Sequence, residues 1–354
     1  MTNEVMKNET ETSPEHEPEP NYEPNPELAA PETTADNGVF VEPQVDLASV
    51  SGIWKIAFKT HWIFFSTCFG ALFLYNAYQL YKVYRMRNMP NRRYAATVQI
   101  LVNVLALTRL LALSIAPYEL VNNPPERIPV VVTRLLFSFG YPCLFSGFVF
   151  VHKIFMLLSK FQVMATNAIG IKLIALVLAV HYVAVVASEL ATTYMKGARF
   201  LLVFCALYYM IGCLGISASL LFSGRRVVQK MLKIEANLVK FQNNNNTEVM
   251  DKTNQKRANA SAKVIRITLL AAVFGVLCAL LYIYTLLVII RGLSNKSFAP
   301  NAWTWLVVNT FLRLFELCLA ATMSYAVGSI YQRSSLNRVQ PSQNSKGSRT
   351  GHTL

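Results

Sequence analysis

Residues 267–290 read ITLLAAVFGVLCALLYIYTLLVII, and this stretch decides the fold. It contains no charged side chain. About 20 apolar residues, in a helix that rises about 1.5 Å per residue, cross the hydrocarbon core of a bilayer, which is about 30 Å thick. The stretch is long enough to do so, and it therefore predicts a transmembrane helix.

Six more runs of this kind occur in the chain. Each is bounded by charged residues, proline or asparagine, which a lipid-exposed helix does not tolerate. The sequence therefore predicts an all-α fold: a polytopic membrane protein, built as a bundle of seven transmembrane helices with disordered termini. The predicted spans are residues 61–81, 95–116, 130–158, 171–192, 199–222, 267–290 and 303–327.

The third run is the longest, and it contains Gly140 and Pro142. A proline removes a backbone hydrogen bond and kinks a helix, and neighbouring helices can satisfy the freed carbonyl. We therefore predict one bent span with its kink at these two residues. A re-entrant pair of half-helices is the alternative.

Composition sets this chain apart from soluble proteins. The 354 residues are 53% hydrophobic and 15% charged, whereas soluble domains have about 25% charged residues. Basic residues flank the apolar runs and do not form a patch on a polar domain, so no nucleic-acid partner is expected. All six cysteines fall within predicted spans, which excludes a disulfide-built secreted domain. The lipid bilayer is the expected environment and partner.

Charge divides the chain into parts. Residues 1–50 hold 12 of the 19 acidic residues and one lysine, a net charge of −11, and the other 32 basic and seven acidic residues give +25. The first 50 residues are rich in proline and glutamate, so they cannot bury enough surface to fold. We predict a disordered acidic tail over 1–50, a membrane domain over 51–330 with a cytoplasmic loop over 223–266, and a disordered cytoplasmic tail over 331–354.

The basic residues also predict an orientation. They gather in the first, third and fifth connections and after the last span, and the fifth connection alone carries ten of them. Lys and Arg concentrate on the cytoplasmic side of a membrane. We therefore expect the amino terminus outside and the carboxyl terminus in the cytoplasm, at the plasma membrane or in the secretory pathway. Asn8 would then lie in an N-glycosylation sequon on the outer side.

Five polar residues lie at the depth of the bilayer. An ionisable group costs at least a few kcal/mol at the centre of a membrane helix, so such residues face the bundle interior or a cavity. Two of the five are three residues apart and share a helical face. We predict an intramembrane polar cluster, which is either an internal ion pair that fixes helix packing or part of a ligand or ion pathway. Its members are Arg109, Glu189, Asn309, Arg313 and Glu316.

The fifth connection begins with a basic amphipathic helix over residues 225–241. Its apolar residues recur at spacings of three and four, opposite a basic face. Such a helix binds anionic lipid or docks a cytosolic protein, and we expect one of these two partners at residues 225–266. The basic residues of the helix are Arg225, Arg226, Lys230, Lys233 and Lys240.

Residues 105–160 carry a recognisable pattern. Arg109 lies in one span, Pro117 and Tyr118 follow its end, and the next span contains YPCL at residues 141–144. The pattern resembles the proline-rich transmembrane protein family, types 3 and 4, and the resemblance covers most of residues 50–330. The chain departs from the family at Ala116, where an acidic residue is usual, and in its short amino-terminal region. The resemblance implies a multi-pass membrane protein and supplies no molecular activity.

Motifs for enzyme chemistry are absent from the sequence. It has no CxxC, HxxxH, GxSxG or Walker loop, so we expect no metal, no cofactor and no enzymatic activity. The motifs of rhodopsin-like receptors are missing as well. We predict a receptor-like or adaptor role in signalling or membrane organisation, with the ligand unidentified. The alternative is a transporter or channel that uses Arg109, Arg313 and Glu316.

Overall fold

The computed structural model describes residues 52–85, 92–115, 130–159, 169–195, 198, 200–244, 251–294 and 301–339. This part of the chain forms seven α-helices and contains no strand. The helices are α1 (Gly52–Arg85), α2 (Arg92–Ile115), α3 (Val130–Ser159), α4 (Ile169–Tyr194), α5 (Phe200–Asn244), α6 (Asp251–Ser294) and α7 (Ala302–Val339). The tail predicted for residues 1–50, with its sequon at Asn8, lies outside the described residues.

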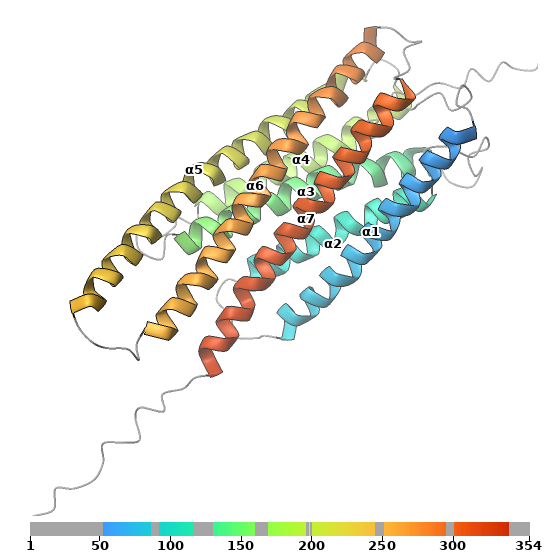
Figure 1. Ribbon diagram of the computed structural model, residues 1–354. Helices are drawn as coiled ribbons and strands as arrows, with labels where there is room; N and C mark the ends of the chain where they lie inside the picture. The colour runs from blue at the N-terminus through green and yellow to red at the C-terminus, as the bar shows by residue number, and fades with distance from the viewer. Residues whose placement is uncertain are drawn as a thin grey trace, which may run out of the picture. The chain divides into compact units, whose positions relative to one another are not determined.

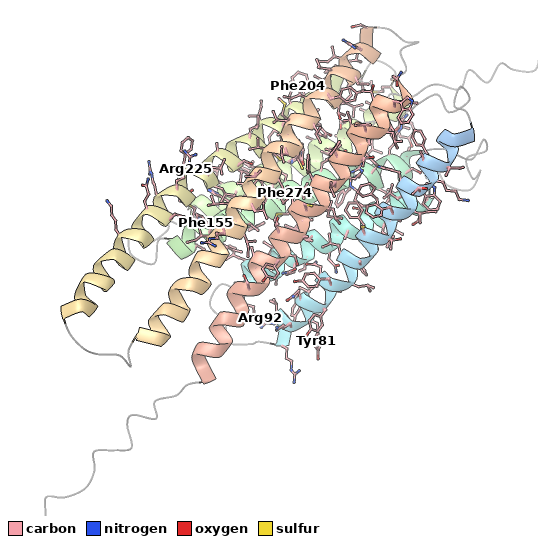
Figure 2. All side chains as sticks on the ribbon, in the orientation of Figure 1. Tyr81, Arg92, Phe155, Phe204, Arg225 and Phe274 are labelled. Carbon is pink, nitrogen blue, oxygen red and sulfur yellow. The ribbon has the colours of Figure 1, made fainter. Side chains whose placement is uncertain are left out.

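Each of these helices is long and apolar enough to cross a membrane. The predicted all-α architecture with seven transmembrane helices is therefore confirmed. Large apolar side chains such as Leu176, Val183 and Phe204 remain exposed on the helices, and in a membrane such side chains face lipid tails that are as apolar as they are. Figure 2 shows the side chains along all seven helices.

Helices α3 and α7 have the most neighbours in the bundle. α3 packs against α2, α4, α5 and α7, and α7 packs against α1, α2, α3 and α6. In Figure 1, α3 runs behind α6 and α7. Fully buried apolar side chains, among them Phe69, Leu105 and Phe148, fill the space between the helices. The buried polar side chains on α3 and α7, such as Arg313 and Glu316, therefore have little access to water.

α3 is a single helix that runs through Pro142. The third apolar run is thus one span, and the re-entrant pair does not form. The bend at Gly140 and Pro142 stays a prediction.

Several helices extend beyond their predicted spans, among them α1, which begins at Gly52 instead of residue 61. α5 continues to Asn244, α6 begins at Asp251 and α7 ends at Val339. Residues 251–266, predicted as part of a cytoplasmic loop, and residues 331–339, predicted to be disordered, are therefore helical. Once a span has formed, each added residue gains one hydrogen bond without a new nucleation cost, and Lys, Arg, Gln and Ala in these segments are good helix formers. Figure 1 shows the extensions of α5 and α6 at the same end of the bundle.

Candidate functional site

Arg109 lies on the buried face of α2, in line with Val102, Leu105 and Ala106. Its side chain is 0% exposed. The Nε atom donates a hydrogen bond to Oε1 of Glu316 on α7 over 2.8 Å, and Nη1 donates to the backbone carbonyl of Phe137 on α3 over 2.5 Å. One guanidinium group therefore connects three helices.

Arg313 and Glu316 lie one helical turn apart on α7. Nη1 of Arg313 is 2.5 Å from Oε2 of Glu316. The two carboxylate oxygens of Glu316 thus accept hydrogen bonds from two different arginines, Arg109 and Arg313, and all three side chains are almost completely buried. We call these three residues the Arg–Glu cluster. It holds two positive charges and one negative charge, so its formal net charge is +1.

Aromatic rings stabilise this surplus positive charge. The guanidinium carbon of Arg109 lies 4.7 Å from the ring centre of Phe137 and 4.6 Å from that of Tyr141. The guanidinium carbon of Arg313 lies 4.6 Å from the Phe137 ring. A cation over an aromatic face gains about 2 kcal/mol or more when it is desolvated. The ring of Phe137 therefore stabilises both arginines, and its backbone carbonyl also accepts a hydrogen bond from Arg109.

Gly140 makes room for the Arg109 side chain. A Cβ atom at this position would lie 2.7 Å from the guanidinium carbon of Arg109, which is shorter than any normal carbon contact. Pro142 lacks an N–H group, so the carbonyl of Ser138, four residues earlier, loses its helical donor. The sequence assigned Gly140 and Pro142 to a kink, and the structure gives the glycine a second role as space for the cluster.

Two of the five predicted cluster members have other hydrogen-bond partners. Asn309 donates a hydrogen bond from Nδ2 to the carbonyl of Trp305, one turn earlier in its own helix, over 3.2 Å. Glu189 on α4 accepts a hydrogen bond from the hydroxyl of Ser138 on α3. Both residues are buried. Depth in the bilayer predicted their burial, but depth does not decide which helices face one another.

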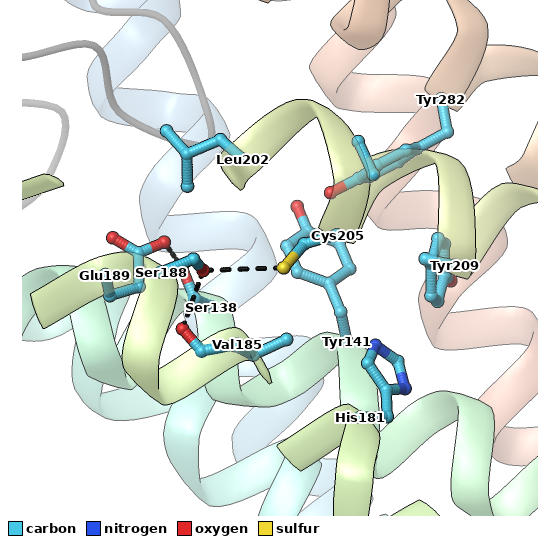
Figure 3. Close-up of a pocket in the computed structure, with 11 residues that line it drawn as sticks. Ser138, Tyr141, His181, Val185, Ser188, Glu189, Leu202, Cys205, Tyr209 and Tyr282 are labelled. Atoms are coloured by element: carbon cyan, nitrogen blue, oxygen red, sulfur yellow. Dashed lines mark hydrogen bonds between the residues drawn. The ribbon is translucent and has the colours of Figure 1, made fainter. Parts of the chain in front are cut away.

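Glu189 belongs to a small cavity between α3, α4, α5 and α6, which we call the α3–α6 cavity (Figure 3). Its volume is about 20 Å³, enough for one ordered water molecule. The thiol of Cys205 lies 3.4 Å from the hydroxyl of Ser188, which itself donates to the carbonyl of Val185. The polar and aromatic lining residues are Ser138, Tyr141, His181, Ser188, Glu189, Cys205, Tyr209 and Tyr282.

Tyr141 connects the cavity to the Arg–Glu cluster. Its ring lines the cavity and also packs against the guanidinium group of Arg109. On the cavity side the ring centres of Tyr209 and Tyr282 lie 5.4 and 5.2 Å from that of Tyr141, and 4.9 Å from each other. A change in the cavity that moves Tyr141 would therefore act directly on Arg109.

Sequence analysis missed a second buried network, formed by Asn76 of α1, Gln99 of α2 and Ser324 of α7. Asn76 Nδ2 donates to the Gln99 carbonyl over 2.5 Å, and Gln99 Nε2 donates to the Ser324 carbonyl over 3.1 Å. The Ser324 hydroxyl lies 2.8 Å from the side-chain oxygens of both Asn76 (Oδ1) and Gln99 (Oε1). The available signal was weak, because each of the three apolar runs contains several amide or hydroxyl side chains and nothing in the sequence distinguishes these three. Helices α2 and α7 are thus joined at two depths.

The basic helix predicted at residues 225–241 is part of α5. Arg225, Arg226 and Lys233 are exposed, and Figure 2 shows Arg225 on the outer side of α5. The side chains of Lys230 and Lys240 lie outside the described residues, as do Pro117 and Tyr118. The basic side chains of the helix that are described thus face away from the bundle, whereas Val228 packs against the hydrophobic core.

Neither a metal-binding group nor a disulfide occurs in the described part of the chain. Where the structure describes the chain, no group of three His, Cys, Asp or Glu side chains is placed to hold a metal ion. All six cysteines are free thiols.

Residues 31–345 match the proline-rich transmembrane protein 3 domain. No match was found among curated proteins. The family match covers most of the chain, including every described helix, so the chain belongs to the proline-rich transmembrane protein 3 family.

Proposed function

We propose that this member of the proline-rich transmembrane protein 3 family is a receptor-like protein without enzymatic activity. A small molecule would occupy the α3–α6 cavity, and α5 would transmit its binding to a cytosolic protein that docks on the basic helix. This role is narrower than what the family supports, which is a multi-pass integral membrane protein.

The observation that carries the proposal is the continuity of α5. Cys205 and Tyr209, near its start, line the cavity, and Arg225 and Arg226, further along, are exposed. α5 has 45 residues, which at about 1.5 Å per residue gives about 68 Å, against about 30 Å for the hydrocarbon core. One unbroken helix therefore leads from the cavity to a point well beyond the membrane.

The orientation supports the same role. Basic residues concentrate in the connections that the sequence assigns to the cytoplasm, so the proposal places the amino terminus outside and the carboxyl terminus in the cytoplasm. The cavity uses residues near the end of α4 and near the start of α5. In this orientation it lies toward the outer surface, where an extracellular molecule has the shortest path to it.

A protein with an acidic face suits the basic helix better than lipid does. A helix that binds a membrane surface lies in the plane of the headgroups. The basic residues of α5 instead lie in the continuation of a membrane-spanning helix, so the residues beyond Arg226 point away from the headgroups. Their positive charge can then attract a protein partner with an acidic surface.

The experiment measures whether the cavity and the extensions of α5 and α6 are coupled. Spin labels are introduced through non-canonical amino acids at Gln229 and Arg266, both exposed, in the full chain in lipid nanodiscs. Ser188→Leu fills the cavity, and we expect the distance between the labels to change by about 1–2 Å, the usual size of a helix shift. The matched control, Val183→Leu, lies on the exposed side of the same helix and should leave the distance unchanged.

A label distance that stays at the wild-type value in Ser188→Leu, as in Val183→Leu, would contradict the receptor-like role.

The alternative function, a transporter or channel, requires the charged residues to line a path that water can reach. The side chains of Arg109, Arg313 and Glu316 are closed off by each other and by aromatic rings, which favours a structural role for the cluster. Transport would be favoured instead if the wild-type protein carried ions or solutes across proteoliposome membranes and this flux disappeared in both Arg109→Gln and Glu316→Gln.

A further inference from the structure

We propose that the α3–α6 cavity binds a protonated amine. This inference rests on the proposed function, because it names the ligand class of the same cavity. Four features of the cavity carry it: an unsatisfied histidine, a buried carboxylate, tyrosine walls and a small volume.

The first feature is His181. Its side chain is 2% exposed and lines the cavity, and neither ring nitrogen has a hydrogen-bond partner in the described part of the chain. A neutral imidazole offers one donor and one acceptor, and buried polar groups in folded proteins are almost always paired. A molecule from outside the chain therefore completes the hydrogen bonding of His181, and an N–H group of an amine supplies a donor for its free acceptor nitrogen.

The second feature is Glu189, a carboxylate that is also 2% exposed. One of its oxygens accepts a hydrogen bond from Ser138. Arg134 interacts electrostatically with Glu189 and also donates a hydrogen bond to Thr193 over 3.3 Å. Neither Arg134 nor Thr193 lines the cavity. The carboxylate is thus the only formally charged side chain in the described lining, and it attracts a cation.

The third feature is the aromatic wall formed by Tyr141, Tyr209 and Tyr282. The face of an aromatic ring attracts an ammonium group, and such rings recur in proteins that bind amines. The hydroxyls of Tyr141 and Tyr282 point into the space beside Cys205 (Figure 3). Hard metal cations prefer shells made of oxygen ligands alone, so a wall of rings and an imidazole favours an amine over Na⁺.

The fourth feature is size. A cavity of about 20 Å³ holds a group about as large as a water molecule. An ammonium head group has this size, whereas a carboxylate or phosphate is larger and would meet Glu189. The ligand we infer is therefore a small primary amine, or a larger molecule that inserts only its amine.

Cys205 offers a test on the unmodified protein, because its thiol lines the cavity and is partly exposed. The full chain in nanodiscs is treated with two thiol reagents that differ in charge: cationic aminoethyl methanethiosulfonate and neutral methyl methanethiosulfonate. Mass spectrometry measures the labelling rate at each cysteine. Cys68 and Cys318 are partly exposed but lie outside the cavity, so they serve as internal controls.

We expect the cationic reagent to be favoured at Cys205, relative to the two controls, on the order of tenfold, as attraction to a carboxylate at short range predicts. Methylammonium should protect Cys205 and leave Cys68 and Cys318 unaffected. The preference should disappear in Glu189→Gln, which keeps the size of the side chain. Protection by methylammonium in the wild-type protein tests the proposal even if this variant does not fold.

Equal labelling of Cys205 by both reagents, or protection by Na⁺ at the same concentration as methylammonium, would overturn the amine assignment. The result separates the two proposals. If methylammonium does not bind but the label distances still respond to Ser188→Leu, the receptor-like role stands and the ligand class is wrong. If methylammonium binds and leaves those distances unchanged, the amine site stands without the receptor-like role.

Discussion

Glu316→Gln should be among the most damaging single substitutions in the membrane domain. Glu316 accepts hydrogen bonds from Arg109 over 2.8 Å and from Arg313 over 2.5 Å, and its side chain is 2% exposed. Glutamine keeps the shape and removes the negative charge, so two buried guanidinium groups lose their only acidic partner within the Arg–Glu cluster.

The magnitude follows from this geometry. Removing one partner of a buried ion pair costs about 3–5 kcal/mol, because a charge remains in a medium of low dielectric constant. Folded proteins are stable by about 5–15 kcal/mol, so the loss is a large share of the total. At about 1.4 kcal/mol per factor of ten, the unfolded fraction should rise by about 10²–10⁴, and delivery to the cell surface should fall.

The assay combines thermal unfolding of the purified full chain with surface delivery in cells. Arg225→Gln, which removes an exposed charge on α5, is the matched control and should behave as wild type. A triple variant, Arg109→Met, Arg313→Met and Glu316→Leu, should recover much of the lost stability, because replacing a whole buried ionic group by apolar residues of similar volume is often neutral or stabilising. Wild-type stability of Glu316→Gln would refute the reasoning.

Three further predictions follow from other contacts. Gly140→Ala should lower the free energy of unfolding by about 1–3 kcal/mol, because the added Cβ meets Arg109, whereas Gly215→Ala, with open space around it, should not; equal effects in chemical denaturation would argue against the packing described. Ser324→Ala should lower the free energy of unfolding by about 1–3 kcal/mol, because it leaves a buried amide oxygen unpaired. Ser329→Ala should change it little, because the Ser329 hydroxyl donates to a carbonyl of its own helix. Epitope tags at the two termini should show the amino end accessible in intact cells and the carboxyl end only after permeabilisation, and two cytosolic ends would reject the orientation.

Much of the membrane architecture could be predicted from the sequence. All seven apolar runs correspond to helices, because hydrocarbon forces each backbone segment to satisfy its own hydrogen bonds and the required length is fixed. The ends of α5, α6 and α7 were less predictable. Polar composition indicated loops there, yet helices propagate from a formed span into residues that have no strong preference against them.

The candidate site was predicted only in part. Arg109, Arg313 and Glu316 were identified because an ionisable group in a membrane helix needs a partner. Glu189 met the same criterion, and Asn309 was included as a polar residue in the same span as Arg313, yet both have different partners. The serines and the cysteine of the α3–α6 cavity gave no signal at all, because such residues are common in membrane helices and their spacing along the chain shows no pattern.

The sequence by itself determined which segments cross the membrane, since hydrophobicity and length are properties of each segment alone. It also determined that a few charged residues must be buried. Only the tertiary structure decided which of them meet, because that depends on which helices pack together and on their rotation about their own axes. Glu316 lies against Arg109, 207 positions away in the chain, and Gly140 leaves the space in which they pair. Contacts of this range arise from packing between helices, which no local pattern in the chain encodes.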